Sequence, residues 1–302
     1  MLDVTARDGA LVVHAPAKVN LTLRVLRRRA DGYHDLESVV AAVGLSDTLT
    51  FRPASGLSMS SEGLEVPAGE ANLVLKAARA LREACGVGAG AEVRLQKRIP
   101  LSRGLGGGSS DAAAALAALN VLWACGLGRE DLARLGARVG SDVPLFLGSP
   151  VGVMRGRGER IEPLSARPQW WVALAWPPYG LPTAEVYAAY DRLEDRRDAR
   201  HPAATDIVAH LAGPARAAGP FVLNDLEPAA RAVRHNGADL GRVFREAGAA
   251  ACGMTGSGSA WFALADSEAD AQAHVTAARA AGCEAVLTTM LAETGSQQET
   301  LS

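Results

Sequence analysis

Residues 103–111 (RGLGGGSSD) combine four glycines with two serines, directly before a stretch rich in helix-forming alanines. Glycine permits a positive φ angle and a close approach of the backbone to a ligand. The first turn of a helix presents unpaired N–H groups and the positive end of the helix dipole. Together these properties predict a site for an anion such as a phosphate group.

Two other interpretations of this glycine loop are open. No lysine follows the glycines, so the Walker pattern is not matched, and backbone amides with the hydroxyls of Ser109 and Ser110 would have to carry the binding. The loop could instead be a flexible connection, with Ser109 or Ser110 as the N-cap of the next helix. A dinucleotide-binding fold fits less well, because the connection from Lys97 to the glycines is too long for the tight first turn of that fold.

Two further groups of polar residues could take part in chemistry. From Ala17 to Leu26 apolar and polar residues alternate, which predicts a half-buried strand with Lys18 and Asn20 on the same face. Asp142 stands in a turn before a Val-Pro pair. Taken alone, each residue is more typical of a bland role than of catalysis: Lys18 of an exposed strand lysine, and Asp142 of a turn aspartate.

The elements of the first half must position these groups. Helical periodicity predicts helices at 72–85 and 129–139, ended by Gly86 and Gly140, and alanine-rich composition predicts a third helix at 111–124. A strand is expected at 91–97, so the glycine loop lies between a strand and a helix. Residues 141–144 are expected to form a loop leading into an apolar segment at 145–147.

The second half predicts a β-α-β-β-α-β order with inserted helices, which is the split arrangement of a ferredoxin-like domain. The expected elements are strand 170–176, helices 184–193, 227–235 and 240–247, strands 250–254 and 260–264, helix 268–281 and strand 285–289. We expect an N-terminal domain at 1–165, a C-terminal domain at 166–292, an exposed connection at 195–202 and a disordered tail at 293–302.

Composition and charge exclude several classes of protein. The chain has 302 residues, of which 48% are hydrophobic and 21% charged, as in ordinary globular proteins. Its 31 basic and 33 acidic residues give a net charge of -2, so no excess positive charge is available to bind nucleic acid.

Membrane, secretory and zinc-binding patterns are absent from the sequence. No apolar run approaches the roughly 18 to 20 residues of a membrane span, and no secretory signal is recognisable. The four cysteines form no Cys-x-x-Cys pair, so a zinc or redox motif is not indicated. A cytoplasmic protein with free thiols is expected.

Three segments resemble the GHMP kinases, a family named for galactokinase, homoserine kinase, mevalonate kinase and phosphomevalonate kinase. They are the glycine loop with its flanks (100–110), the segment APAKVNL at 15–21 and the segment MTGSGSA at 254–260. The resemblance implies an α+β fold of two domains, the first like ribosomal protein S5 and the second the ferredoxin-like domain. It also implies an ATP-dependent small-molecule kinase whose ATP-binding residues are Pro100, Leu101, Ser102, Arg103, Gly104, Leu105, Gly106, Gly107, Gly108, Ser109 and Ser110.

Three further segments narrow the resemblance within the family: RADGYH at 29–34, GSDVP at 140–144 and NDLEP at 224–228. They are similar to those of members that phosphorylate a cytidyl-diphosphate sugar alcohol in the non-mevalonate route to isoprenoids. Three positions depart from the family pattern. Arg103 replaces a small residue, Asp111 stands where asparagine is frequent, and Leu145 replaces an aromatic residue.

The resemblance assigns roles to individual residues. Asp142 would be the base that accepts the proton of the acceptor hydroxyl, and Lys18 would keep Asp142 ionised and orient the acceptor oxygen. Tyr33 and Tyr187 would stack on the cytosine ring, and His34 would hydrogen-bond its edge. The implied substrate-binding residues are Asn20, Tyr33, His34, Thr183, Tyr187, Gly256 and Ser257. For Tyr187, packing in the core is an equally good explanation.

The implied cofactors are ATP and Mg²⁺, with Ser110 as the candidate metal ligand. The partners are a small-molecule substrate and at most a second copy of the chain, in a monomer or weak homodimer, with neither nucleic acid nor membrane. Three other functions are open: another GHMP kinase acting on homoserine or a mevalonate-type alcohol, a non-catalytic relative that binds a small molecule, and a nicotinamide dehydrogenase.

Overall fold

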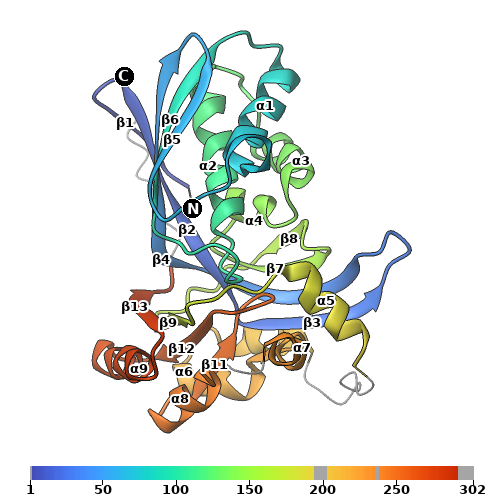
Figure 1. Ribbon diagram of the computed structural model, residues 1–302, viewed down its shortest axis with the longest axis vertical. Coiled ribbons are helices and arrows are strands. Elements are labelled where there is room, and N and C mark those ends of the chain that lie inside the picture. Colours follow the sequence, from blue (N-terminus) through green and yellow to red (C-terminus); the bar gives the residue numbers. More distant parts are fainter. Residues whose placement is uncertain (1, 194–202, 235–237, 292–302) are drawn as a thin grey trace.

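The computed structural model describes residues 2–193, 203–234 and 238–291. The predictions for residues 195–202 and 293–302 lie outside these ranges. The described chain forms two β-sheets, one above the other in Figure 1, and helices pack against each of them. No helix in the described ranges has the length and apolar character needed to span a membrane.

The larger sheet is organised around one long strand, β4 (His34–Ala54), which pairs with four other strands and is antiparallel to each of them. These partners are β2 (Ala10–Asn20), β3 (Thr22–Arg28), β6 (Gly90–Lys97) and β7 (Val151–Gly156). Its outer strands are β1 (Val4–Arg7), β5 (Leu57–Gly63), β8 (Arg160–Pro163) and β10 (Leu223–Asn224).

The prediction of one half-buried strand from Ala17 to Leu26 was wrong in two respects. The segment is divided between β2 and β3, with the break at Leu21. Its polar residues are also buried, since Lys18 and Asn20 are only 4% and 2% exposed. The alternating pattern suggested a solvent-facing side, but that side is covered by residues distant in the sequence. The placement of Lys18 and Asn20 on one face is confirmed, because their side chains are hydrogen-bonded to each other.

Four helices cover one face of the larger sheet: α1 (Leu73–Cys85), α2 (Gly107–Leu122), α3 (Arg129–Val139) and α4 (Val143–Leu147). Helix α1 ends at Gly86 as predicted, where φ is 63°, and the side chain of Asn72 caps its start. Residues 141–142 form a turn as expected, but helix α4 takes in Val143 and Pro144 of the expected loop, because a proline is tolerated in the first turn of a helix.

Helix α2 begins at Gly107, four residues before the predicted start at Asp111. Its N-cap is Gly106, with a φ of 72°, so neither Ser109 nor Ser110 caps the helix. Most of the alanines that follow are fully buried, and packing against the sheet extends the helix through glycines that are poor helix formers in isolation. Two glycines and both serines of the loop therefore belong to the first turn of α2.

The smaller sheet confirms the split β-α-β prediction. Its strand order is β11–β12–β9–β13, with antiparallel neighbours throughout, so that β9 and β11 flank β12. These strands are β9 (Trp171–Trp176), β11 (Ala251–Met254), β12 (Trp261–Ala265) and β13 (Glu284–Thr289). The helices are α5 (Thr183–Asp191), α6 (Ala215–Ala218), α7 (Glu227–Val233), α8 (Leu240–Glu246) and α9 (Glu268–Ala280).

The two sheets share part of their core. Strand β10, from the second half of the chain, runs parallel to β3 in the larger sheet. One buried cluster contains Val19 and Val39 of the larger sheet together with Leu174 and Phe262 of the smaller sheet. Strand β8 ends the first set of elements and β9 begins the second, and on this basis we propose to keep the domain ranges 1–165 and 166–292.

Gly104 provides a test of this contact between the domains. Gly104 and Gly126 both have positive φ angles, of 76° and 69°. A Cβ atom at Gly104 would lie 2.1 Å from the carbonyl oxygen of Thr255, whereas one at Gly126 would have no neighbour within 4 Å. We expect Gly104→Ala to lower the free energy of unfolding in urea by about 3 kcal/mol and Gly126→Ala by about 1 kcal/mol. Equal losses would show that the close approach at Gly104 is unimportant.

Candidate active site

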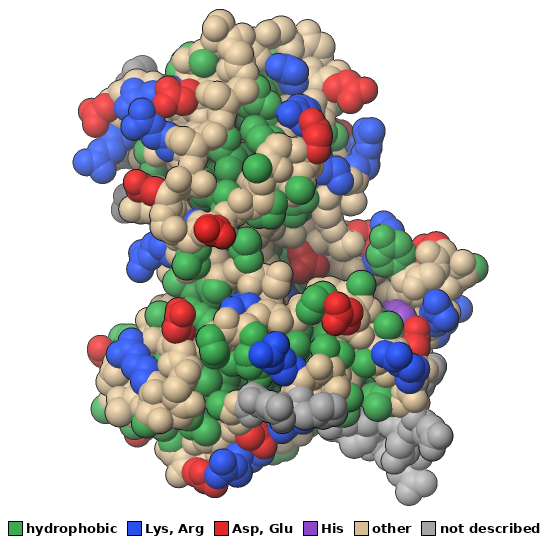
Figure 2. All heavy atoms as spheres, viewed as in Figure 1, with side chains coloured by type: hydrophobic (Ala, Val, Ile, Leu, Met, Phe, Trp, Pro, Cys, Tyr) green, Lys and Arg blue, Asp and Glu red, His purple; other side chains and the backbone are tan. Residues whose placement is uncertain are grey.

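A cavity of about 900 Å³ lies where the glycine loop, β2, α5 and the turn after β7 meet. Its outer part is visible as the recess between the upper and lower parts of the molecule in Figure 2. Every predicted site residue except Ser110 lines it. These residues are Lys18, Asn20, Tyr33, His34, Pro100, Leu101, Ser102, Arg103, Gly104, Leu105, Gly106, Gly107, Gly108, Ser109, Asp142, Thr183, Tyr187, Gly256 and Ser257.

The glycine loop supplies backbone groups to this cavity. Gly104 and Gly106 adopt positive φ angles, and the first residues of α2, from Gly107 to Ser109, line the wall. The amides at the start of a helix have no partners within it, and this first turn contains no acidic residue. The arrangement can therefore accept an anion through N–H groups and the helix dipole.

A buried ionic network lies directly beneath the loop. The Lys97 ammonium is 2.6 Å from a carboxylate oxygen of Asp47 and 2.6 Å from one of Asp111. A Cβ at Gly107 would lie 3.1 Å from the Lys97 nitrogen, so this cation sits against the loop. Burial raises the pKa of Asp111 to about 7, although Lys97 opposes the shift. Asp111, one of the three departures from the family pattern, thus serves as a partner of Lys97.

Ser110 is placed differently from the other predicted residues. It is fully buried, lies outside the cavity wall, and its hydroxyl has no hydrogen-bond partner in the described part of the chain. Ser109, one residue earlier, does line the cavity. In the described ranges no three His, Cys, Asp or Glu side chains cluster in a way that could hold a metal ion. The assignment of Mg²⁺ to Ser110 stays a prediction, and its burial does not favour it.

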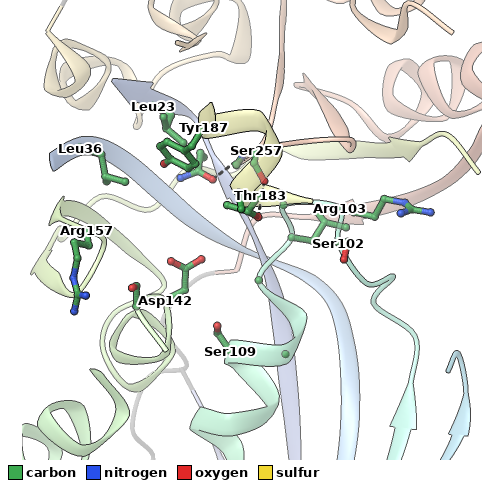
Figure 3. Close-up of a pocket in the computed structure, with 18 of the residues that line it drawn as sticks. Leu23, Leu36, Ser102, Arg103, Ser109, Asp142, Arg157, Thr183, Tyr187 and Ser257 are labelled. Carbon is green, nitrogen blue, oxygen red and sulfur yellow. Dashed lines mark hydrogen bonds between the residues drawn. The ribbon is translucent and has the colours of Figure 1, made fainter. Parts of the chain in front are cut away.

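Lys18 and Asp142 meet at the cavity although 124 residues separate them in the sequence. The Lys18 nitrogen is 3.9 Å from a carboxylate oxygen of Asp142, and the lysine side chain is 5% exposed against 32% for the aspartate. Burial lowers the pKa of Lys18, and the negative charge of Asp142 opposes this effect. Asp142 stands just before α4, and its carboxylate points toward the side of the cavity that carries Thr183 and Tyr187 (Figure 3).

Asn20 connects Lys18 to the third glycine segment. Its carboxamide oxygen accepts hydrogen bonds from the Lys18 nitrogen at 2.5 Å and from the backbone N–H of Gly256 at 2.9 Å. Its carboxamide nitrogen donates to the hydroxyl of Ser38. Because these protein groups already engage the side chain, Asn20 holds other residues in place, and its predicted contact with the substrate stays untested.

Asn224 holds the same glycine segment from the other side. Its carboxamide nitrogen donates to the carbonyl oxygens of Met254 and Gly256, at 2.8 and 2.9 Å. Next to this segment, the hydroxyls of Ser257 and Thr183 are 3.0 Å apart. The resemblance at 224–228 therefore corresponds to a supporting residue, since Asn224 is buried and does not line the cavity.

The other end of the cavity is aromatic and cationic. Tyr33 is 55% exposed, and the Arg157 guanidinium lies over its ring at 4.8 Å from the ring centre. His34 is buried and stacks on Tyr187, with the ring centres 5.0 Å apart. These residues give a flat aromatic surface beside a positive charge, which suits a heteroaromatic ring carrying phosphate groups.

Three charged residues of the cavity wall were missed from the sequence: Arg28, Arg157 and Asp191. Arg157 occupies a Gly-Arg-Gly turn after β7, and both glycines have positive φ angles, so the turn pattern was a usable signal. Asp191 follows Tyr187 by four residues on α5 and therefore lies on the same helix face. No local sequence pattern predicts that Arg28 lines the cavity, because its position depends on the long hairpin formed by β3 and β4.

The remaining departures from the family pattern have little effect on the cavity. The Arg103 side chain extends away from the other labelled residues in Figure 3, and it donates to the carbonyl oxygen of Leu101. Leu145 is buried in the core around α2 and α4, and it is not part of the cavity wall.

Comparison with known proteins identifies the family. Residues 72–149 match the family model for the GHMP kinases N terminal domain, and residues 211–282 match that for GHMP kinases C terminal. The 4-diphosphocytidyl-2-C-methyl-D-erythritol kinase of Pelotomaculum thermopropionicum is 44% identical, over 83% of this chain and 87% of the relative. This chain belongs to the GHMP kinase family.

Other relatives and solved structures agree with this assignment to the GHMP kinases. The enzyme of the same name from Salinispora arenicola is 41% identical over 88% of this chain and 86% of its own length. A crystal structure of 4-(cytidine 5'-diphospho)-2C-methyl-D-erythritol kinase aligns with a TM-score of 0.78 at 36% identity, covering 92% of this chain and 98% of the other.

The fold extends to more distant GHMP kinases. Homoserine kinase from Cytophaga hutchinsonii has a TM-score of 0.70 at 22% identity, covering 97% of this chain and 98% of the other, and shares the fold. As a member of this family, the chain is a small-molecule kinase, and ATP is its phosphate donor.

The burial of Lys18 leads to a prediction that separates stability from catalysis. Lys18→Met should raise the free energy of unfolding by about 1 kcal/mol at pH 7, because it removes a buried charge while Asn20 keeps its bond to Gly256. The same change should lower kcat by about 100-fold or more. Urea unfolding and steady-state kinetics measure the two effects. Lys76→Met is the control: this exposed lysine on α1 donates to the carbonyl oxygen of Val139 at 3.3 Å, away from the cavity, so the change should leave kcat unaltered and should not raise the free energy of unfolding. A destabilised but active Lys18→Met variant would contradict this view.

Proposed function

We propose that this GHMP kinase transfers the γ-phosphate of ATP to the 2-hydroxyl of 4-diphosphocytidyl-2-C-methyl-D-erythritol, a step in non-mevalonate isoprenoid biosynthesis. The observation that supports it most is that one cavity contains three features. These are the glycine loop, the Lys18–Asp142 pair, and an aromatic end formed by Tyr33, His34 and Tyr187. Curated relatives of that name, 40–46% identical, support the same substrate.

The residues suggest a direct transfer. Asp142 accepts the proton of the 2-hydroxyl as its oxygen attacks the γ-phosphorus, and the bond from that phosphorus to the β–γ bridging oxygen breaks, which leaves ADP. The Lys18 ammonium faces both Asp142 and the acceptor oxygen, and stabilises negative charge there. Amides of Gly107 and Gly108 hold the phosphate groups in line with the attack.

Mg²⁺ enters this proposal as part of the ATP complex, in which it offsets charge on the β and γ phosphates. The cavity wall offers the Ser109 hydroxyl and no cluster of carboxylates for the metal within the described residues. The steps described above are those of this chain's own side chains and amides. Location in the cytoplasm and a monomeric or weakly dimeric state stay predictions from the sequence.

The alternative substrates are small alcohols without a nucleobase, such as homoserine or mevalonate. The aromatic end of the cavity, with Arg157 over Tyr33, would have no partner in such a substrate. A non-catalytic binding protein is disfavoured because both members of the Lys18–Asp142 pair are present and in contact. A nicotinamide dehydrogenase is disfavoured because the chain belongs to the GHMP kinase family.

The proposed function is tested by following ADP release from Mg²⁺-ATP with purified protein. The acceptors offered are the cytidyl-diphosphate sugar alcohol, homoserine and mevalonate, each in a separate assay. Turnover of the cytidyl substrate alone is the expected result, and selective turnover of either small alcohol would refute the proposal.

Asp142→Asn should lower kcat by at least about 100-fold, because the amide cannot accept the hydroxyl proton. The affinity for ATP and the unfolding midpoint should change little, since Asp142 is partly exposed and makes no cap bond at α4. Steady-state kinetics with thermal unfolding measure these effects. Near-normal turnover would remove Asp142 from the mechanism.

Tyr33→Ala should raise the KM for the cytidyl substrate about tenfold while leaving the KM for ATP within about twofold, because the exposed ring offers a stacking surface worth roughly 1–3 kcal/mol per base. Tyr33→Phe keeps the ring and is the matched control, with both KM values near those of the parent. The opposite pattern, a larger effect on ATP, would assign Tyr33 to the nucleotide donor instead.

A further inference from the structure

Three side chains of one helix surround the His34 ring. Tyr187, Tyr190 and Asp191 stand at positions i, i+3 and i+4 of α5, so they project from one face toward the hairpin of β3 and β4, against which α5 lies in Figure 1. Tyr187 stacks on the imidazole, with the planes 25° apart, and Tyr190 meets it edge-on at 6.2 Å. The His34 Nε2 atom is 2.8 Å from a carboxylate oxygen of Asp191. Because Tyr187 packs on the face of the imidazole and Asp191 contacts its edge, these contacts hold the His34 ring in one orientation.

The contact with Asp191 decides which ring nitrogen carries the proton. An ionised carboxylate can only accept hydrogen bonds, so the Nε2 atom of His34 must be the donor. The second oxygen of Asp191 lies 3.5 Å from the Nε atom of the Arg28 guanidinium. In a neutral imidazole with its proton on Nε2, the Nδ1 atom is an acceptor.

The Nδ1 atom of His34 has no hydrogen-bond partner in residues 2–193, 203–234 and 238–291, and the residue lines the cavity. A ligand in the cavity can therefore supply that partner, and it must be a donor. Among pyrimidine bases, cytosine presents an exocyclic amino group at the 4-position, which donates. Uracil presents a carbonyl oxygen at the same position, which would face the lone pair of Nδ1.

We propose that Asp191 is a positioning residue that fixes the tautomer of His34 and thereby makes the acceptor end of the cavity select cytosine over uracil. This inference rests on the proposed function and adds to it the residue that recognises the base, His34, and the residue that orients it, Asp191. Asp191 touches His34 and acts through it.

The test compares two acceptors, the cytidyl-diphosphate sugar alcohol and the same molecule with uracil in place of cytosine. The wild-type protein should favour the cytidyl compound by at least about tenfold in kcat/KM, because the uracil carbonyl leaves an acceptor unpaired. Asp191→Ala should reduce this preference to about threefold or less, mainly by raising the KM for the cytidyl compound, with the KM for ATP unchanged. Glu185→Ala removes an exposed carboxylate from the first turn of the same helix and should keep the full preference.

A double-mutant cycle tests whether Asp191 acts through His34. In the His34→Ala background, the further change Asp191→Ala should cost no more than about twofold in kcat/KM, since the ring that Asp191 orients is gone. Asp191→Asn serves if Asp191→Ala does not fold. Its amide can either accept from or donate to Nε2, so both tautomers are populated and the preference should fall to an intermediate value.

Three outcomes would overturn the proposal, and they differ in what they refute. If wild-type protein turns over the cytidyl compound and both Asp191 variants retain its base preference, the inference about Asp191 fails while the proposed function stands. If the wild-type protein turns over neither acceptor, the proposed function fails and this inference fails with it. Additive losses in the double-mutant cycle would also refute action through His34.

Discussion

A single buried carboxamide, that of Asn20, ties together the parts of this active site. Its oxygen accepts from the Lys18 ammonium and from the N–H of Gly256, which lies 236 residues further along the chain. Its backbone N–H donates to the hydroxyl of Thr255, whose carbonyl oxygen lies against Gly104. A buried polar group without partners would be costly, so these bonds fix how the two domains meet. The position of the phosphate loop over Lys18 follows from that contact.

Two kinds of group make parts of the cavity positive: backbone N–H groups in the glycine loop and basic side chains elsewhere. The phosphate loop relies on N–H groups and a helix dipole, with Lys97 buried beneath and already shared by Asp47 and Asp111. Lys18 lines the cavity and is desolvated, so its charge acts at short range on Asp142. Arg28 and Arg157 lie at the aromatic end. A nucleotide and a second phosphate-bearing substrate can thus occupy one cavity with separate cationic partners.

Helix α5 illustrates how the second domain completes a site built mainly on the first. It supplies Thr183 beside the third glycine segment, and Tyr187 and Asp191 beside His34. These contacts come from one helix of nine residues, so the positions of the acceptor groups are correlated. A change in the position of α5 would move Thr183 at the third glycine segment together with Tyr187 and Asp191 at His34.

Features that depend on neighbours in the chain could be predicted from the sequence. The periodicity of 72–85 and 129–139, the stop at Gly86, the place of the glycine loop between a strand and a helix, and the β-α-β-β-α-β order all follow from local patterns, and the structure confirms them. Tertiary contacts decided the rest. Packing moved the start of α2 back to Gly107, and distant segments buried Lys18 and Asn20 on a strand that reads as half exposed. The pairing of His34 with Asp191 joins residues 157 positions apart. Burial and pairing depend on which remote segments approach, and no local pattern of side chains contains that information.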